Sequence, residues 1–315
     1  CRGTLVNFGE IATYDVSKQY LMNHLLFKDD YKLHISSSIT NIVDCTLGEG
    51  GISKEILDEV ENAKITGIDT DLTILKIAKE RLKSYNNIEF IHENYKNIKS
   101  IKSFSDTQIH NIIFDFGLSN FHLRNIDKAF SFDSSNKLDM RFDDSENLTA
   151  HTVINKYSKT ELMEILVDYA DFPSNSNTTK FVEYIVQKRP IDTCENLKKI
   201  CLNFYRNLSY KRAIHNITRI FQAIRIEVNN EYENVKNGLE NALSLIACEG
   251  RIFTITYHSG EDRIVKNIFN KYKLLNESDK RFRIVNKKVI KPKYKEQISN
   301  SNSKSAKLRI IERTL

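Results

Sequence analysis

Residues 41–51 read Asn-Ile-Val-Asp-Cys-Thr-Leu-Gly-Glu-Gly-Gly. Apolar residues lead into a cluster of three glycines, and a helical pattern follows from Ile52 to Val60. A second apolar run, residues 65–69, then ends in the carboxylate of Asp69. This order predicts a strand, a bare turn, a helix and a second strand that carries an acid at its tip.

The glycine turn and Asp69 together suggest a nucleoside site. Glycine lets the backbone come close to a ligand, and a carboxylate about 20 residues further on can accept hydrogen bonds from ribose hydroxyls. A dinucleotide fingerprint has the spacing G-x-G-x-x-G, whereas Gly48, Gly50 and Gly51 crowd around Glu49. Because Glu49 would repel a phosphate but not a cationic sulfonium, the pattern favours S-adenosylmethionine over NAD. The alternative is a βαβ unit whose glycines only form a tight turn.

The pattern beyond this unit predicts an open α/β sheet. Strands are expected at residues 40–45, 65–69, 88–91, 111–115, 251–257, 281–285 and 307–312. The early strands alternate with helical patterns at residues 53–60 and 72–85, which is typical of parallel strands joined by crossover helices. Asp69, Tyr95 and Asp115 fall at or just beyond strand carboxyl ends, where such sheets bind ligands.

The alternation of strands and helices stops after Asp115. Residues 120–147 are expected to form a long loop, and its interleaved aromatic, Asp and Arg residues favour a functional role. Helical patterns then follow at residues 159–169, 178–187, 194–203 and 217–245. We expect the first three and the start of the last to form a helical subdomain inserted between two strands of the sheet.

Asp115-Phe116-Gly117-Leu118-Ser119 places a carboxylate where the fourth strand ends. When a methyl group is transferred to an amino nitrogen, that nitrogen must line up with the sulfonium methyl. A hydrogen-bond acceptor on the N–H helps, because the lone pair is otherwise delocalised into the base. Asp115 can be this acceptor, or it can bind the amino acid end of the cofactor; otherwise it only caps the loop.

A second polar cluster, Tyr257-His258-Ser259-Gly260-Glu261-Asp262-Arg263, follows the fifth strand. His258 can relay a proton, since its reference pKa lies near neutrality. The alternative is a helix start with Ser259 as the cap and Asp262 three positions later. The two interpretations are compatible.

A helical face carries Arg219, Gln222, Arg225 and Asn229 at spacings of three and four residues. Three roles are open for this face: it could bind RNA phosphates, pack against the loop at residues 120–143, or face solvent. The sequence gives no metal-ligand spacing for His92, His110, His151 and His215, so no metal site is expected.

The net charge of +6 is distributed unevenly. Residues 263–315 contribute +12 and residues 180–225 contribute +7, so the rest of the chain is acidic. Two basic regions favour a polyanionic partner, although solvated surface lysines would give the same composition. Interleaved aromatic residues that could stack on bases favour nucleic acid; they are Phe204, Tyr205, Tyr210, Phe282 and Tyr294.

Composition excludes several other classes of protein. With 40% apolar and 28% charged residues, the chain is that of an ordinary globular protein. No apolar run approaches the roughly 18 residues of a membrane span, so no membrane partner is expected. The five scattered cysteines fit neither a disulfide framework nor a zinc site, which favours a reducing, cytoplasmic location.

Several segments, in this order, resemble the bacterial 16S ribosomal RNA (cytosine-N4)-methyltransferase family over about residues 40–315. They are residues 43–51, Gly67-Ile68-Asp69-Thr70-Asp71, residues 115–119, Phe130-Ser131-Phe132, Leu138-Asp139-Met140-Arg141, residues 218–226, residues 258–266 and Ser305-Ala306-Lys307-Leu308-Arg309. The resemblance implies a class I methyltransferase fold with a helical insertion. It also implies S-adenosylmethionine as cofactor and a cytosine of small-subunit ribosomal RNA as target, within a 30S-type particle.

The resemblance also carries over the family's site positions by motif. The cofactor positions fall on Gly50, Gly51, Ile52, Asp69, Tyr95, Asp115 and His122. Asp115 is the candidate catalytic carboxylate, and His258 and Asp262 are candidates for orienting the target base. The chain departs from the family at Ile52, where His is usual, at His122, where Gln is usual, at Tyr95, where Phe is usual, and at Gly260, where Leu is usual.

Residues 1–125 and 236–315 are accordingly expected to form the cofactor-binding domain, and residues 126–235 the inserted substrate-recognition unit. The main rival hypothesis is a catalytically weakened RNA-binding or ribosome-assembly factor that keeps the fold, motivated by Ile52. A methyltransferase acting on a small molecule is disfavoured by the basic regions. The oligomeric state is left open, with a dimer as one option.

Overall fold

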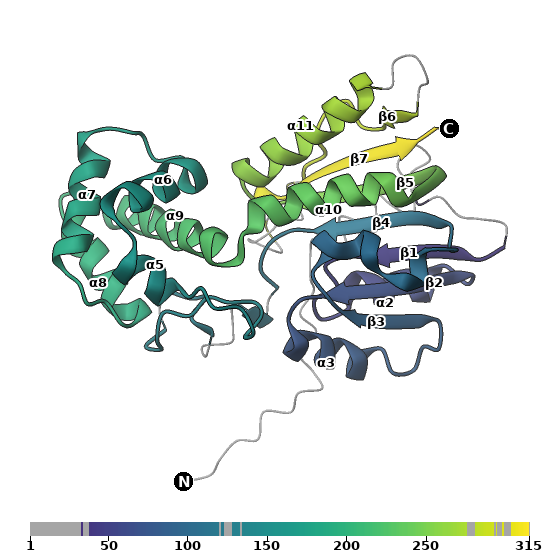
Figure 1. The fold of residues 1–315 in the computed structure, drawn as a ribbon, viewed down its shortest axis with the longest axis horizontal. Helices are drawn as coiled ribbons and strands as arrows, with labels where there is room; N and C mark the ends of the chain where they lie inside the picture. The colour runs from purple at the N-terminus through teal and green to yellow at the C-terminus, as the bar shows by residue number, and fades with distance from the viewer. Residues whose placement is uncertain are drawn as a thin grey trace, which may run out of the picture.

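The centre of the molecule is a seven-stranded sheet in the order β3-β2-β1-β4-β5-β7-β6 (Figure 1). The computed structural model describes residues 33, 38–119, 121–122, 128–132, 134–275, 281–292, 294, 298 and 304–314. The strands are β1 (Thr40–Asp44), β2 (Ala63–Asp69), β3 (Ile88–His92), β4 (Ile109–Asp115), β5 (Ile246–Thr256), β6 (Phe282–Ile284) and β7 (Lys307–Arg313). Neighbours from β3 to β5 pair in parallel, and β7 runs antiparallel to β5 and β6. The predicted α/β fold, mostly parallel with one antiparallel strand, is confirmed over these residues.

The strand order reverses between β1 and β4, which places a crevice at the carboxyl ends of these two strands. Hydrogen bonds hold together the segments that leave the strands there. The N–H of Cys45 donates to the carbonyl oxygen of Ile113 at 2.9 Å, and the N–H of Asp115 donates to Thr46 Oγ1 at 2.7 Å. The glycine turn and the segment after β4 therefore border the same crevice.

Helices cover both faces of the sheet, because its central strands are apolar on both sides. On one face, α2 (Gly51–Glu59) buries Ile56 in a cluster that includes Ile42 of β1. On the other, α10 (Glu231–Leu245) and α11 (Ser259–Leu275) bury Leu239 and Phe269 in a cluster with Phe114 of β4. α3 (Leu72–Arg81) packs against β2 and β3, and the short 3-10 helices η1 (Tyr95–Ser100) and η2 (Lys102–Phe104) lead into β4.

The segment between β4 and β5 builds a helical unit around an apolar core of its own. Its helices are α5 (Ala150–Lys156), α6 (Lys159–Ala170), α7 (Ser176–Gln187), α8 (Cys194–Phe204) and α9 (Tyr210–Asn229). Their buried side chains, among them Leu166, Phe181, Leu197 and Phe221, form one cluster. Figure 1 shows this unit beside the sheet, with α9 leading into α10. Within the described residues, no helix combines the length and apolarity needed to cross a bilayer.

The single helix predicted for residues 217–245 is wrong, because the chain forms two helices there. α9 ends at Asn229, and Asn230 adopts a left-handed conformation with φ 50° and ψ 42° before α10 begins. Asn tolerates this region better than most residues, and the Asn234 side chain donates to the Asn229 carbonyl oxygen at 2.9 Å. The apolar periodicity continues on both sides of the break, which is why it predicted one helix.

The start of α11 also differs from the predicted cap. The helix begins at Ser259, so Ser259 is not the residue before it, and its hydroxyl donates to Asp171 Oδ2 at 2.6 Å. Glu261 takes the capping role predicted for Asp262, because its carboxylate accepts from the N–H of Tyr257 at 3.0 Å. Most of the predicted polar loop at residues 296–306 lies outside the described residues.

Candidate functional site

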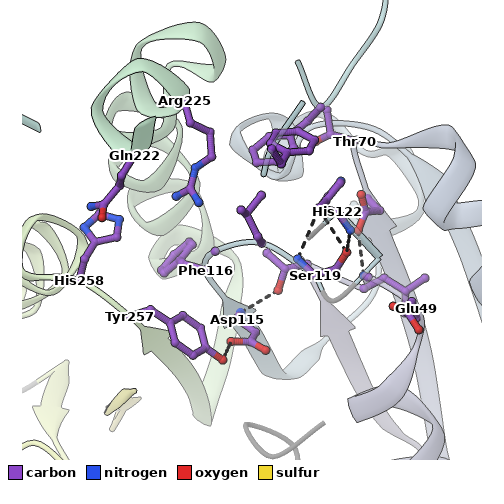
Figure 2. Close-up of a pocket in the computed structure, with 18 of the residues that line it drawn as sticks. Glu49, Thr70, Asp115, Phe116, Ser119, His122, Gln222, Arg225, Tyr257 and His258 are labelled. Atoms are coloured by element: carbon purple, nitrogen blue, oxygen red, sulfur yellow. Dashed lines mark hydrogen bonds between the residues drawn. The ribbon is translucent and has the colours of Figure 1, made fainter. Parts of the chain in front are cut away.

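A cavity of about 650 Å³ lies in the crevice at the carboxyl ends of the strands. Its walls come from the glycine turn, the ends of β2, β4 and β5, the loop after β4, and α9. Figure 2 shows Arg225 reaching from α9 toward Phe116, with Asp115 and Tyr257 on the side of the sheet. The cavity therefore lies where the sheet domain and the helical unit meet.

The glycine turn is held open by left-handed backbone and by Asp69. Gly48 and Gly50 have φ values of 53° and 77°, a region that favours glycine. Asp69 Oδ2 accepts from the N–H of Gly48 at 2.8 Å, and Asp69 Oδ1 accepts from the N–H of Asp71 at 2.9 Å. The acid at the tip of β2 thus fixes the shape of the turn that faces it.

The residues of the turn differ in their access to the cavity. Gly51 and Ile52 line it together with Glu49, whereas Gly50 is not among its described lining residues. Gly50 instead precedes α2, and a Cβ there would lie 2.6 Å from Leu82 Cδ1. Gly50 therefore shapes the turn, through its positive φ and its close packing against Leu82 just after α3.

Asp115 lies at the end of β4 and lines the cavity. The hydroxyl of Tyr257, just beyond β5, donates to Asp115 Oδ1 at 2.8 Å. Since the backbone N–H of Asp115 is also held by Thr46, the position and the orientation of this carboxylate are both fixed. A carboxylate can accept up to about four hydrogen bonds, so this one retains capacity for a ligand donor.

Tyr95 lines the cavity from the first residue of η1. Its ring packs edge-on against Phe114, with centroids 5.6 Å apart and an interplanar angle of 82°. A Cβ on Gly238 of α10 would lie 2.6 Å from Tyr95 Cδ2, so the glycine makes room for the ring. Burial raises the pKa of Tyr95 well above its usual range, which keeps the phenol neutral.

His122 lines the cavity but directs both ring nitrogens to protein groups. Nε2 lies 3.2 Å from Asp71 Oδ2, and Nδ1 lies 3.2 Å from Ser119 Oγ. Its ring also packs against Phe130 and Phe142, with centroids 4.9 and 5.0 Å away. His122 therefore fastens the loop after β4 to the start of α3.

Asp71 is the buried anchor of this contact. It accepts from the N–H groups of Thr73 and Ile74 at the start of α3, and Lys128 Nζ lies 3.4 Å from its Oδ2. Burial alone would raise the pKa of Asp71, but the hydrogen bond from His122 and the charge of Lys128 lower it to about 2. The loop is thus held by a carboxylate that is ionised at any physiological pH.

The predicted polar cluster after β5 is brought to the cavity only in part. His258 lines the cavity, and its Nε2 lies 2.7 Å from the buried carboxylate of Glu261. Asp262 is not among the described lining residues; Arg309 Nε and Lys307 Nζ lie 2.7 and 3.1 Å from its carboxylate oxygens instead. On a helix, adjacent residues point about 100° apart, so Glu261 and Asp262 cannot both face His258.

Gly260, the second residue of α11, is packed closely against α10. A Cβ on Gly260 would overlap the hydroxyl of Tyr232 at the start of α10. The Tyr232 ring in turn packs against His258, with centroids 5.8 Å apart, and against Tyr169 of α6, at 5.1 Å. Tyr232 thus fills the space beside His258 that a larger residue at position 260 would need.

The four polar residues predicted to share one face of α9 serve different purposes. Gln222 and Arg225 line the cavity, and Arg225 makes two hydrogen bonds to Glu231, at 2.7 and 3.0 Å. Asn229 braces the loop as predicted, since its amide oxygen accepts from Phe142 N at 2.8 Å. Arg219 lies over the Phe172 ring, 4.4 Å from its centroid, and donates to the carbonyl oxygen of Ala170.

Sequence reasoning missed most of the apolar lining. Phe130, Phe132, Met140 and Phe142 come from the loop after β4, and Phe221 comes from α9. The loop was expected to be functional, but its sequence does not show which rings turn inward. Asn229 helps to set the course of the loop backbone, because its amide also donates to the Met140 carbonyl oxygen at 2.8 Å.

Replacing Asp44 by Asn is expected to remove a pH-dependent loss of stability. Asp44 is fully buried at the end of β1, where Ser53 Oγ donates to its carboxylate at 2.8 Å. Burial raises the pKa of Asp44 to about 6, in spite of this hydrogen bond. The folded protein then binds the proton more tightly than the unfolded chain, so the free energy of unfolding falls as pH rises from about 4 to about 6.

The shift corresponds to about 3 kcal/mol of unfolding free energy. Urea denaturation of the wild type and D44N between about pH 4 and about pH 8 measures it. D44N should be the more stable protein above about pH 6 and should lose this advantage near pH 4. A constant difference between the two proteins over this range would contradict the expectation.

Comparison with known proteins decides the family. The model of the MraW methylase family matches residues 25–314. The chain belongs to this family. It is 42% identical over 274 residues to a ribosomal RNA small subunit methyltransferase H of Sulfurihydrogenibium sp. (strain YO3AOP1), covering 86% of this chain and 92% of that protein. The family-level resemblance stated from the motifs is thereby confirmed.

A second relative covers the chain to the same extent. The ribosomal RNA small subunit methyltransferase H of Clostridium botulinum (strain Kyoto / Type A2) is 38% identical over 287 residues, covering 86% of this chain and 92% of that protein. The crystal structure of an rRNA methylase from Streptococcus thermophilus aligns over 95% of both chains, with 12% identity and a TM-score of 0.41.

Proposed function

We propose that this methylase transfers the methyl group of S-adenosylmethionine to the exocyclic N4 of a cytosine in small-subunit ribosomal RNA. The observation that carries the proposal is the cavity itself. It brings the glycine turn, Asp69 and Asp115 together beneath an aromatic loop, in a chain of the MraW methylase family. Such a cavity can hold a cofactor on the side of the turn and a base on the side of the loop.

The residues of the cavity fit S-adenosylmethionine. Its volume, about 650 Å³, lies within the range of pockets for small molecules and cofactors. Glu49, Asp69 and Asp115 border it with three carboxylates, which suits a cationic sulfonium and disfavours a phosphate-bearing dinucleotide. When bound, the cofactor supplies an electrophilic methyl group on a positively charged sulfur.

The residues near the turn would hold this cofactor. We assign the ribose hydroxyls to Asp69, because each of its two oxygens can accept a further hydrogen bond beside the one from Gly48 or Asp71. Gly51 and Ile52 border the methionine portion, and Tyr95 borders the adenine. In our proposal His122 holds the loop after β4 in position, because its Nε2 lies beside Asp71 and its Nδ1 beside Ser119.

Asp115 is the group we assign to the reaction. Its carboxylate would accept a hydrogen bond from the cytosine amino group, turn the nitrogen lone pair toward the methyl group, and hold the proton that leaves. The Tyr257 hydroxyl keeps it in place. Because these dipoles are fixed before the substrate arrives, the transition state gains electrostatic stabilisation without reorganisation.

His258 and Arg225 are assigned to the target base. Arg225 is held in one orientation by Glu231, and its guanidinium always donates, which suits the acceptor atoms O2 and N3 of cytosine. His258 is oriented by the buried Glu261. A base in folded RNA must leave its stack to enter such a cavity, where Phe130, Phe142 and Phe132 offer apolar walls.

The wider organisation follows from this assignment. Residues 1–125 and 236–315 form the cofactor-binding domain in our proposal, and residues 126–235 the recognition unit, supported by the separate core of α5–α9. The substrate is a small ribosomal subunit or its precursor in the cytoplasm.

Transfer of tritium from labelled S-adenosylmethionine to small subunits of a strain lacking the endogenous enzyme tests the function. We expect label in the ribosomal RNA, in N4-methylcytidine after digestion. No incorporation beside an active family member would overturn the proposal. Calorimetric titration with S-adenosylmethionine then tests the rival hypothesis of an assembly factor. Under that hypothesis the protein should bind the cofactor more weakly than about millimolar.

A further inference from the structure

The turn between α8 and α9 exposes a continuous stretch of the chain. All seven residues from Arg206 to Arg212 are exposed, including an aromatic and an aliphatic side chain. Tyr210 is 69% exposed and Leu208 is 39% exposed. We call residues 206–212 the α8–α9 corner. The corner thus presents an aromatic and an aliphatic side chain to solvent.

Aromatic anchors make this corner rigid. Tyr205 is buried and stacks on Phe181 with centroids 5.4 Å apart, and Phe204 meets Phe181 edge-on at 5.1 Å. The N–H of Leu208 donates to the Tyr205 carbonyl oxygen at 2.8 Å. Phe204 and Tyr205, which the sequence suggested could stack on bases, are therefore anchors of the corner, and Tyr210 is the ring that it presents.

The corner is strongly cationic. The sequence contains no Asp or Glu between Glu195 and Glu227. Arg206, Lys211 and Arg212 are exposed, and no carboxylate in the described part of the chain pairs with them. Unpaired cations around an exposed aromatic ring are the combination that binds single-stranded nucleic acid, through phosphates and base stacking.

α9 lines the cavity, and α8 contacts one of the lining residues. On α8, Lys198 Nζ lies 5.0 Å from the ring centroid of the cavity residue Phe132. α9 runs from Tyr210 to the lining residue Arg225 and then joins α10 (Figure 1). At 1.5 Å per residue, the corner is about 22 Å from Arg225 along α9.

We propose that the α8–α9 corner is a second RNA contact, separate from the cavity, which binds unpaired nucleotides at a distance from the methylated cytosine. The inference rests on the proposed function for the identity of the RNA. Unpaired nucleotides are favoured over a duplex, because Tyr210 can stack only on a base that has left its helix. In this arrangement the corner binds the small ribosomal subunit, and methyl transfer takes place in the cavity.

Removing the charges tests the corner. The variant R206Q/K211Q/R212Q should raise KM for small subunits about 10- to 100-fold near 0.1 M salt, because three phosphate contacts are lost. The slope of log affinity against log salt should fall by about 2 to 3. Maximal rate at saturating subunits and affinity for S-adenosylmethionine should stay at the wild-type values, since the cavity is untouched.

A control variant removes the same number of positive charges at positions outside the α8–α9 corner. K76Q/K99Q/K102Q changes three exposed lysines on α3, η1 and η2 and should leave KM and the salt slope close to the wild type. Equal effects of the two triple variants would overturn the inference, because only net charge would then matter. Equilibrium binding to subunits lacking the methyl group is measured in parallel, so the corner is tested even if the wild type transfers no label.

Substitution of Tyr210 tests whether its ring stacks on an unpaired base. Y210A should weaken subunit binding about tenfold, as loss of one base–aromatic contact does, whereas Y210F should bind within about twofold of the wild type. Equal losses in the two variants would overturn the stacking role. Competition separates the partners: an unpaired RNA oligonucleotide should displace subunits from the wild type, and displacement by duplex DNA at the same concentration would overturn the assignment to RNA.

Discussion

Replacing Asp115 by Asn is expected to lower kcat for methyl transfer about 100- to 1000-fold, the usual effect of removing a fixed electrostatic group from a transition state. The amide has nearly the same shape, so the hydrogen bond from Tyr257 can remain. It carries no negative charge, and its NH2 group cannot accept from the cytosine amino group. Single-turnover transfer of tritium to small subunits measures the rate.

Two controls separate this effect from a change in fold or binding. Y257F keeps the carboxylate and removes only the hydroxyl that orients it, so a loss of about tenfold is expected, in line with one lost hydrogen bond. D115N should unfold at a denaturant concentration close to that of the wild type. A D115N enzyme that retains more than about a tenth of wild-type kcat would remove Asp115 from the reaction.

Replacing Glu231 by Ala is expected to have the largest effect on stability. Glu231 is buried and Arg225 is largely shielded at the cavity wall, with side chains 11% and 12% exposed. Burial alone would lower the pKa of Arg225, but the adjacent Glu231 raises it, so the guanidinium stays charged. Removing one partner of such a pair leaves an uncompensated buried charge, which costs about 3–5 kcal/mol of unfolding free energy.

The double variant gives the control. E231A/R225M removes both charges, and it should be more stable than E231A alone, since an apolar replacement of a buried pair is often nearly neutral. Denaturant titration of both variants and of the wild type measures the difference. A loss below about 1 kcal/mol in E231A would mean that water reaches the pair and screens it.

The sheet could be predicted from the sequence because its strands are short apolar runs that end in polar residues. The position of Asp69 and Asp115 at the cavity could also be predicted, because parallel strands bring their carboxyl ends to one edge of the sheet. The strand limits differ from the prediction mainly at β5, which begins at Ile246. That early part includes exposed residues, so it carries less of the apolar signal.

The rest of the site depends on contacts that no local pattern shows. Asp262 and Glu261 are neighbours in the sequence, and only the rotation of α11 decides that Glu261 meets His258. His122 occupies a position expected to touch the cofactor, yet the fold brings Asp71 within reach of its ring. Both outcomes arise from packing between distant segments.

The close packing of Gly260 against Tyr232 has an evolutionary consequence. Because the Tyr232 hydroxyl occupies the volume beside Gly260, neither position can change alone without a clash or a void. Lineages that carry a leucine at position 260 should therefore carry a smaller residue at position 232, and ancestors on the path between the two states should show the tyrosine arriving only after the leucine was lost. Positions 232 and 260 are therefore expected to change together, although 27 residues separate them in the chain.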